Sequence, residues 1–146
     1  MNRQLDSLEP VTYQKAVRLF AAFTLLTGRE LFIVRALATY EEQDALFAQG
    51  RTEPGAIVTN AKGGQSWHNF GRAFDVALEE KQTQKPSWST ASDDLELWRL
   101  LGVIAKWIGL EWGGNFNSIT DFGHFHNTDG MTIDKARAQW ETNNAR

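Results

Sequence analysis

Residues 66–75 read SWHNFGRAFD, and this stretch places His68 seven positions before Asp75, with the small residues Gly71 and Ala73 between them. The overlapping segment AFDVAL alternates in the way of a half-buried strand. Small residues at such a place indicate that the backbone packs closely against a neighbour. A single histidine is more often structural than functional, so the meaning of the pair depends on the rest of the chain.

The flanking segments predict helices and strands that do not alternate regularly, which is typical of the α+β class. A first helix is expected from Pro10 up to the glycine at position 28. Its apolar residues at roughly helical spacing are Val11, Tyr13, Val17, Phe20 and Leu25. The other expected elements are a buried strand over 31–38, a helix over 40–48, a strand over 73–78, a helix over 92–108, short strands in 110–114 and 122–127, and a final helix in 131–143.

The length and composition indicate one globular domain. The chain has 146 residues, of which 42% are hydrophobic and 23% charged. We expect a single domain over 1–146 with a polar tail from about position 141. A net charge of −3 offers no basic surface for nucleic acid or an anionic membrane.

Several classes of site and location are excluded or disfavoured. The chain has no cysteine, which rules out disulfides, thiolate metal sites and a thiol nucleophile. No apolar run approaches the roughly 18 residues that a membrane span needs. The N-terminal segment MNRQLDSLEP lacks the apolar stretch of a secretory signal. We therefore expect the chain to stay in the cytoplasm where it is made unless something else releases it.

The three histidines fall in two places, His68 and the pair His124 and His126, with Asp75 and Asp121 close to them in sequence. Two histidines and an aspartate can hold a catalytic zinc ion and leave one position open. A further carboxylate can then take and deliver a proton. The spacing alone is equally compatible with a structural pair of histidines on one face of a strand.

The segment SWHNFGRAFDVAL matches the S-x-H-x-x-G-x-A-x-D signature of the D-alanyl-D-alanine carboxypeptidase-like zinc peptidases. It most resembles their L-alanyl-D-glutamate endopeptidase branch, which includes many phage endolysins. The resemblance continues over TYEEQDALFAQGRTEPGAIVTNAKGGQSWHNFG and over LEWGGNFNSITDFGHFH, and so covers about 39–126. It implies a small single domain in which a short, mostly antiparallel sheet carries the zinc site and helices flank the sheet.

The resemblance also implies roles for individual residues. One zinc ion per chain would be bound by His68, Asp75 and His124, because Asp121 to Phe125 match the closing D-x-x-H-F pattern. Asp121 would be the catalytic acid and base.

Two further positions and one alternative come from the same comparison of motifs. Ser66 would supply a hydroxyl that supports a ligand or contacts the substrate, and Trp112 would form a wall of the cleft. In relatives with an H-x-H motif the second histidine binds the metal. That alternative makes His126 the third ligand and His124 a catalytic helper.

One position departs from the family. This chain reads ALATYEEQ, so Ala38 stands where the family has an arginine that steadies the substrate or the developing oxyanion. We expect the Cβ of Ala38 to face the cleft. Arg35 is expected to be a poor substitute, since an offset of three in a regular strand points to the opposite face. The alanine is compatible with natural divergence or with a deliberate inactivating change.

The sequence thus predicts a zinc-dependent endopeptidase that hydrolyses the L-alanyl-D-glutamate bond of bacterial peptidoglycan stem peptides. The expected setting is a phage endolysin, a monomer without a separate cell-wall-binding domain, which a holin releases from the host cytoplasm. The alternatives are a D-alanyl-D-alanine carboxypeptidase or dipeptidase, and a weakly active or inactivated variant that binds cell-wall peptide.

Overall fold

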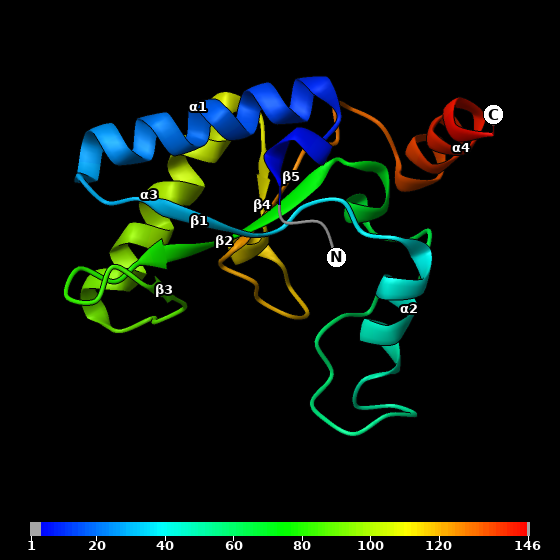
Figure 1. Ribbon diagram of the computed structural model, residues 1–146, viewed down its shortest axis with the longest axis horizontal. Coiled ribbons are helices and arrows are strands. Elements are labelled where there is room, and N and C mark those ends of the chain that lie inside the picture. Colours follow the sequence, from blue (N-terminus) through cyan, green and yellow to red (C-terminus); the bar gives the residue numbers. More distant parts are fainter. Residues whose placement is uncertain (1–3, 146) are drawn as a thin grey trace.

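The computed structural model describes residues 4–145, apart from the side chain of Ser92 (Figure 1). The helices of this part are α1 (Pro10–Thr27), α2 (Tyr40–Ala48), α3 (Ser92–Ile108) and α4 (Ile133–Asn144). The strands are β1 (Leu31–Arg35), β2 (Ala73–Glu79), β3 (Pro86–Ser87), β4 (Glu111–Trp112) and β5 (His124–His126). Short 3₁₀ turns are η1 (Leu5–Ser7), η2 (Trp67–Phe70) and η3 (Gly113–Asn115).

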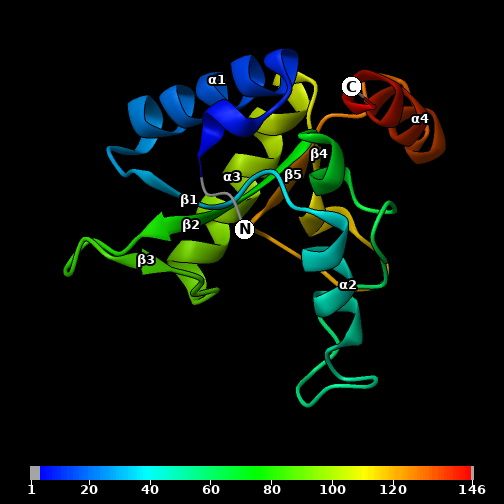
Figure 2. The same ribbon diagram turned by 45° about the vertical axis from the view of Figure 1, so that its right-hand side comes forward.

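The strands form one antiparallel sheet in the order β1-β2-β5-β4, and β3 pairs with the end of β2. The helices α2 and α4 lie towards the end of the molecule away from β3, as Figures 1 and 2 both show. The predicted α+β class with a small, mostly antiparallel sheet is confirmed.

The alternation in β2 separates a core face from a site face. Phe74 and Val76 are fully buried in the hydrophobic cluster, whereas Asp75, between them, points to the opposite face of the sheet. In the register with β5, Phe74 lies opposite Phe125, and their stacked rings have centroids 5.7 Å apart. The same register puts Asp75 opposite His124.

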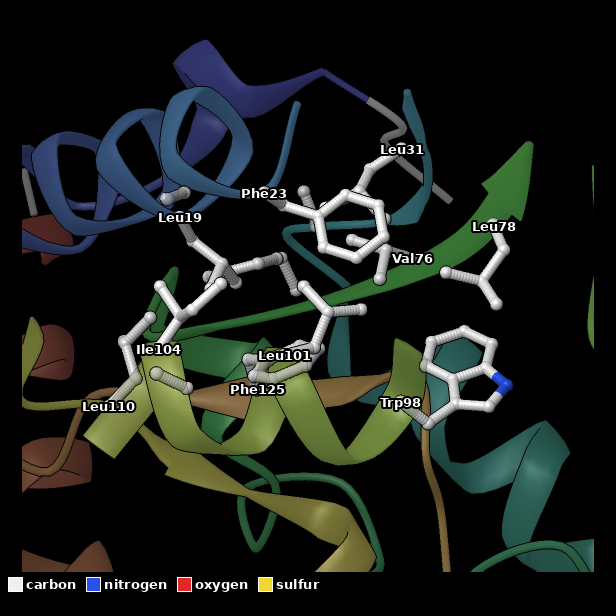
Figure 3. Packing of buried hydrophobic residues seen from close by; sticks show 14 of the residues in the cluster. Leu19, Phe23, Leu31, Val76, Leu78, Trp98, Leu101, Ile104, Leu110 and Phe125 are labelled. Carbon is white, nitrogen blue, oxygen red and sulfur yellow. The ribbon is translucent and has the colours of Figure 1, made fainter. Parts of the chain in front are cut away.

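The hydrophobic core lies between α1, α3 and the sheet (Figure 3). Leu19 and Phe23 of α1 meet Trp98 and Leu101 of α3 there, and all four side chains are almost completely buried. The Nε1–H of Trp98 donates to the carbonyl oxygen of Ser89 at 2.9 Å, so the one polar group of this large side chain is satisfied.

Most of the apolar residues that recur at helical spacing in α1 are not the ones that the helix buries, although Phe20 packs against the core. Its buried residues are Thr12, Ala16, Leu19 and Phe23, whereas Val11, Tyr13 and Val17 are about two-fifths exposed and Leu25 is 86% exposed. The helix carries apolar residues on more than one side, so their spacing did not identify the packed face. The small side chains of Ala16 and Thr12 let the helix approach the rest of the molecule.

The ends of two elements also differ from the prediction. β1 ends at Arg35 instead of extending to Ala38, because the backbone N–H of Ala38 donates to the carbonyl oxygen of His68 at 3.0 Å rather than to a strand. The expected polar tail from about 141 is helical as far as Asn144, and position 146 lies outside the described residues. No helix in 4–145 is long and apolar enough to cross a membrane.

Truncating the buried indole tests the core. Trp98→Ala should lower the free energy of unfolding by about 3–5 kcal/mol, because it removes a large buried side chain and leaves a cavity. Trp107→Ala on the same helix is the matched control, since Trp107 is 86% exposed, and should change stability by no more than about 0.5 kcal/mol. Urea denaturation measures both, and equal effects of the two changes would contradict this packing.

Candidate metal centre

Three side chains converge on the site face of the sheet. His68 comes from η2, Asp75 from β2 and His124 from β5. The Nε2 of His68 lies 3.1 Å from Oδ1 of Asp75 and 3.3 Å from Nδ1 of His124. The Nδ1 of His124 lies 2.9 Å from the same Oδ1. Residues that are 56 positions apart in sequence thus present three potential metal ligands at one point.

Local sequence explains how His68 is held. Ser66 is the N-cap of η2, and its Oγ accepts a hydrogen bond from the backbone N–H of His68 at 3.4 Å. Gly71 ends the turn with a φ of 64°, a left-handed conformation that favours glycine. The side-chain amide of Asn69 donates to the carbonyl oxygens of Ala38 and Thr39. The turn is therefore fixed against the segment that follows β1.

The hydrogen bond of the His68 Nδ1, which points away from the other ligands, determines the tautomer of the ring. Its Nδ1 lies 2.8 Å from the carbonyl oxygen of Ala36, which can only accept, so Nδ1 carries the proton. Burial lowers the pKa of His68, against the opposing charge of Asp75, and favours the neutral ring. Nε2 then has a lone pair and no proton.

The lone pair of the His68 Nε2 and the carboxylate of Asp75 repel each other unless a cation lies between them. Burial alone would raise the pKa of Asp75, but the neighbouring His68 and His124 side chains outweigh burial and lower that pKa. Asp75 is therefore ionised, and its Oδ1 and the Nε2 of His68 are both acceptors. A bound metal ion satisfies both of them at once.

The spacing of the three ligand atoms fits a tetrahedral ion. Ligands at about 2.0–2.1 Å from a tetrahedral zinc ion lie about 3.3 Å from one another. The observed separations are 2.9, 3.1 and 3.3 Å. Two imidazole nitrogens and one carboxylate oxygen suit a borderline divalent metal and leave a fourth position for water or substrate.

His126 lies behind His124 and outside this group of ligands. Its Nδ1 is 3.2 Å from the Nε2 of His124, on the side of that ring away from Asp75. Burial, followed by the charges of His124 and His68, lowers the pKa of His126 to about 3, so its ring is neutral and Nδ1 can accept. The ring also stacks on Trp67, with centroids 5.5 Å apart. This position suits a residue that orients His124 better than it suits a third ligand.

Asp121 borders the same cavity without joining the ligand group. Partial removal of its carboxylate from water, with the negative charge of Asp75 as the next cause, raises its pKa above the usual value. Its backbone is fixed by hydrogen bonds to Gly113 and from the N–H of His124. A carboxylate near the metal position with a raised pKa is suited to accept and return a proton.

The cavity has a volume of about 600 Å³ and is large enough for several residues of a peptide. Ser66 lines it, in agreement with its predicted place next to a ligand. Trp112 does not line this cavity: it borders a second one next to α3, and its Nε1–H donates to the carbonyl oxygen of Phe122 at 2.8 Å. The large aromatic side chains that line it are instead Trp67 and Phe116, and the ring centroid of Phe116 lies 5.5 Å from that of His124.

Phe116 was missed in the sequence because it lies between the expected strands at 110–114 and 122–127, outside any expected element. It is 39% exposed in the polar segment GGNFNSIT. A large aromatic residue between two asparagines has no regular position in a core, and that isolation was the available signal.

The structure reverses the expectations for Ala38 and Arg35. Ala38 is 2% exposed and does not line the cavity, so its Cβ does not face the cleft. Arg35 does line the cavity, and the expectation that it points away is wrong. In the pairing of β1 with β2, Ile33 lies opposite Val76 and Arg35 opposite Asp75, so the register shifts across Val34. This irregularity turns Arg35 to the site face.

Metal analysis tests the ligand group. His68→Ala and His124→Ala should lose stoichiometric zinc, because three ligands are the minimum for an open site. His126→Phe keeps a ring next to Trp67 and should retain one zinc ion at saturation, with affinity lowered by about 10–100-fold through loss of the contact to His124. Calorimetric titration after chelation measures both quantities. Zinc loss in His126→Phe together with zinc retention in His124→Ala would identify His126 as the ligand.

Comparison with known proteins gives a consistent result. Residues 59–127 match a family model described as D-alanyl-D-alanine carboxypeptidase. The peptidoglycan L-alanyl-D-glutamate endopeptidase CwlK of Bacillus subtilis (strain 168) is 38% identical over 123 residues, which are 82% of this chain and 72% of CwlK.

Solved structures share the fold at low sequence identity. The L-Ala D-Glu endopeptidase ChiX of Serratia marcescens has a TM-score of 0.58 and 18% identity, over 85% of this chain and 83% of ChiX. DacB from Streptococcus pneumoniae D39 has a TM-score of 0.60 and 16% identity, over 94% of this chain and 77% of DacB. From the identity to CwlK and the family match, this chain belongs to the D-alanyl-D-alanine carboxypeptidase-like family of metallopeptidases.

Proposed function

We propose that this protein is a zinc-dependent endopeptidase that hydrolyses the L-alanyl-D-glutamate bond of peptidoglycan stem peptides. The observation that carries the proposal is the orientation of His68, whose unprotonated Nε2 faces the Asp75 carboxylate at 3.1 Å beside a peptide-sized cavity. The choice of bond is supported by the 38% identity to CwlK, which is named for that bond.

Different residues of the site would have different roles in hydrolysis. A zinc ion, when bound, would polarise the scissile carbonyl and make a water molecule more acidic. His68, Asp75 and His124 would hold it. Asp121 would take the proton of the attacking water and deliver it to the leaving amine, which its raised pKa favours. The Phe116 ring packs against the His124 ring at the border of the cavity.

A D-alanyl-D-alanine carboxypeptidase is the second candidate. Such an enzyme needs a cation for the free carboxylate at the end of its substrate, and Arg35 supplies one in the cavity. The alanine at position 38 therefore does not argue against this activity. A variant that only binds peptide is disfavoured, because the ligand group and Asp121 are all in place.

Digestion of purified peptidoglycan separates these activities. Cleavage of the L-alanyl-D-glutamate bond should produce new D-glutamate amino termini, whereas a carboxypeptidase would release free D-alanine. Asp121→Asn should keep the zinc ion and lower turnover by about 10²–10⁴-fold, because an amide cannot accept the proton. Asp129→Asn makes the same change at an exposed residue that does not line the cavity and is the matched control. Release of D-alanine without new amino termini would refute the proposed bond.

We further propose that this activity serves phage lysis, a role supported by the resemblance of SWHNFGRAFDVAL to phage endolysins. Expression in the bacterial cytoplasm should leave culture turbidity unchanged until a holin permeabilises the inner membrane, and turbidity should then fall. Asp121→Asn with the same holin is the control. Equal rates of lysis with the wild type and this variant would contradict the role.

A further inference from the structure

Arg35 is the only lysine or arginine that lines the cavity within the part of the chain that the structure describes. Its position opposite Asp75 in the sheet brings it to the edge of the ligand group. The other charged side chains of the cavity are the acids Asp75 and Asp121. Among the charged side chains of the described cavity, Arg35 is therefore the one that would attract an anionic group of a substrate.

Gln43 fixes the orientation of the guanidinium group. Its Oε1 accepts from Nη2 of Arg35 at 2.6 Å. The side chain of Gln43 is 1% exposed, and its Nε2 donates to the carbonyl oxygen of Ala61 at 2.8 Å and to Oγ1 of Thr59 at 3.4 Å. Because both donors of this amide are directed at acceptors, its oxygen must face Arg35. The arginine is thus held in place before any ligand arrives.

The positive charge of Arg35 has no counterion in the described residues. Asp75, Glu42 and Asp121 are close enough to influence it electrostatically, but no carboxylate of residues 4–145 forms an ion pair with it. Its Nε is buried and has no hydrogen-bond partner there. A partly buried cation without a counterion is costly, so the arrangement is suited to receive an anion from outside the protein.

The proposed substrate carries such an anion next to the bond that is cut. A D-glutamyl residue has two carboxyl groups, and only one of them can continue the stem peptide. The other is a free carboxylate, or an amide in modified peptides. We propose that Arg35 binds this free carboxylate on the leaving side of the scissile bond, so that the enzyme selects stem peptides whose D-glutamyl residue is not amidated. This inference rests on the proposed L-alanyl-D-glutamate endopeptidase function.

Two synthetic stem peptides that differ only in this group test the inference. One has the free D-glutamyl carboxylate and the other has the amide. The wild type should prefer the carboxylate peptide by roughly 10–100-fold in kcat/KM, mainly through KM, as expected for a hydrogen bond between charged groups. Arg35→Gln should bring that ratio close to one. Arg35→Lys should keep part of the preference, since it retains the charge without the planar fork.

A binding measurement makes the result independent of turnover. The product peptide that begins with D-glutamate should bind the zinc-loaded wild type, in calorimetry, about 10–100-fold more tightly than it binds Arg35→Gln. Arg99→Gln is the matched control, because Arg99 lies on the outer side of α3 with a side chain that is 60% exposed. It should change neither the selectivity nor the binding. The melting temperature and zinc content of each variant show whether the fold is kept.

The outcomes separate this inference from the proposed function. Cleavage of both peptides at the L-alanyl-D-glutamate bond with no preference in the wild type overturns the role of Arg35 and leaves the function standing. A loss in Arg35→Gln that affects kcat equally for both peptides also overturns it. If neither peptide is cut at that bond, the function fails, and calorimetry with the product peptide still decides whether Arg35 binds the carboxylate.

Discussion

The pairing of β2 with β5 is the constraint on which the site depends. Phe74 opposite Phe125 is buried in the core, and the same register places Asp75 opposite His124 on the other face. A slip of one residue would bring the charged side chains into the core and the phenyl rings onto the site face. The burial of two aromatic rings therefore enforces the position of two ligands, and the stability of the fold and the geometry of the site have one origin.

Hydrogen bonds on the outer side of the histidine rings fix the orientation of ligands that the strand register has placed. The carbonyl oxygen of Ala36 fixes the proton of His68 on Nδ1, and His126 provides an acceptor for the Nε2 side of His124. The His68 ring then presents an unprotonated nitrogen to Asp75, and the contact to His126 lets the Nε2 of His124 donate while its Nδ1 faces Asp75, without any change in conformation. Because the rings are already oriented, the binding of an ion requires little reorganisation of the protein.

The sequence predicted the residues of the ligand group better than their surroundings. His68, Asp75 and His124 were identified from a motif, and the structure brings them together; their binding of zinc stays a prediction. The class of the fold and most element positions followed from periodicity. The packed face of α1 did not, because that helix has apolar residues on several sides and only the neighbouring elements select one.

The positions of Arg35 and Ala38 relative to the cavity could not be predicted from the alternation of side chains in a regular strand. A prediction from spacing assumes that successive residues of a strand alternate between its two faces. The register shift across Val34 interrupts this alternation. The segment after Arg35 is held by side-chain and backbone contacts to η2 rather than by strand pairing. Such contacts join residues about thirty positions apart and leave no periodic signal.

The irregularity at the end of β1 has an evolutionary consequence. It turns Arg35, which is not at the position of the family's arginine, towards the cavity, so a positive charge that is absent from one column of an alignment can be supplied from another. Loss of a familiar arginine from its column then does not mean that the cavity has lost its positive charge. A comparison that scores each column separately would not detect the charge that Arg35 supplies.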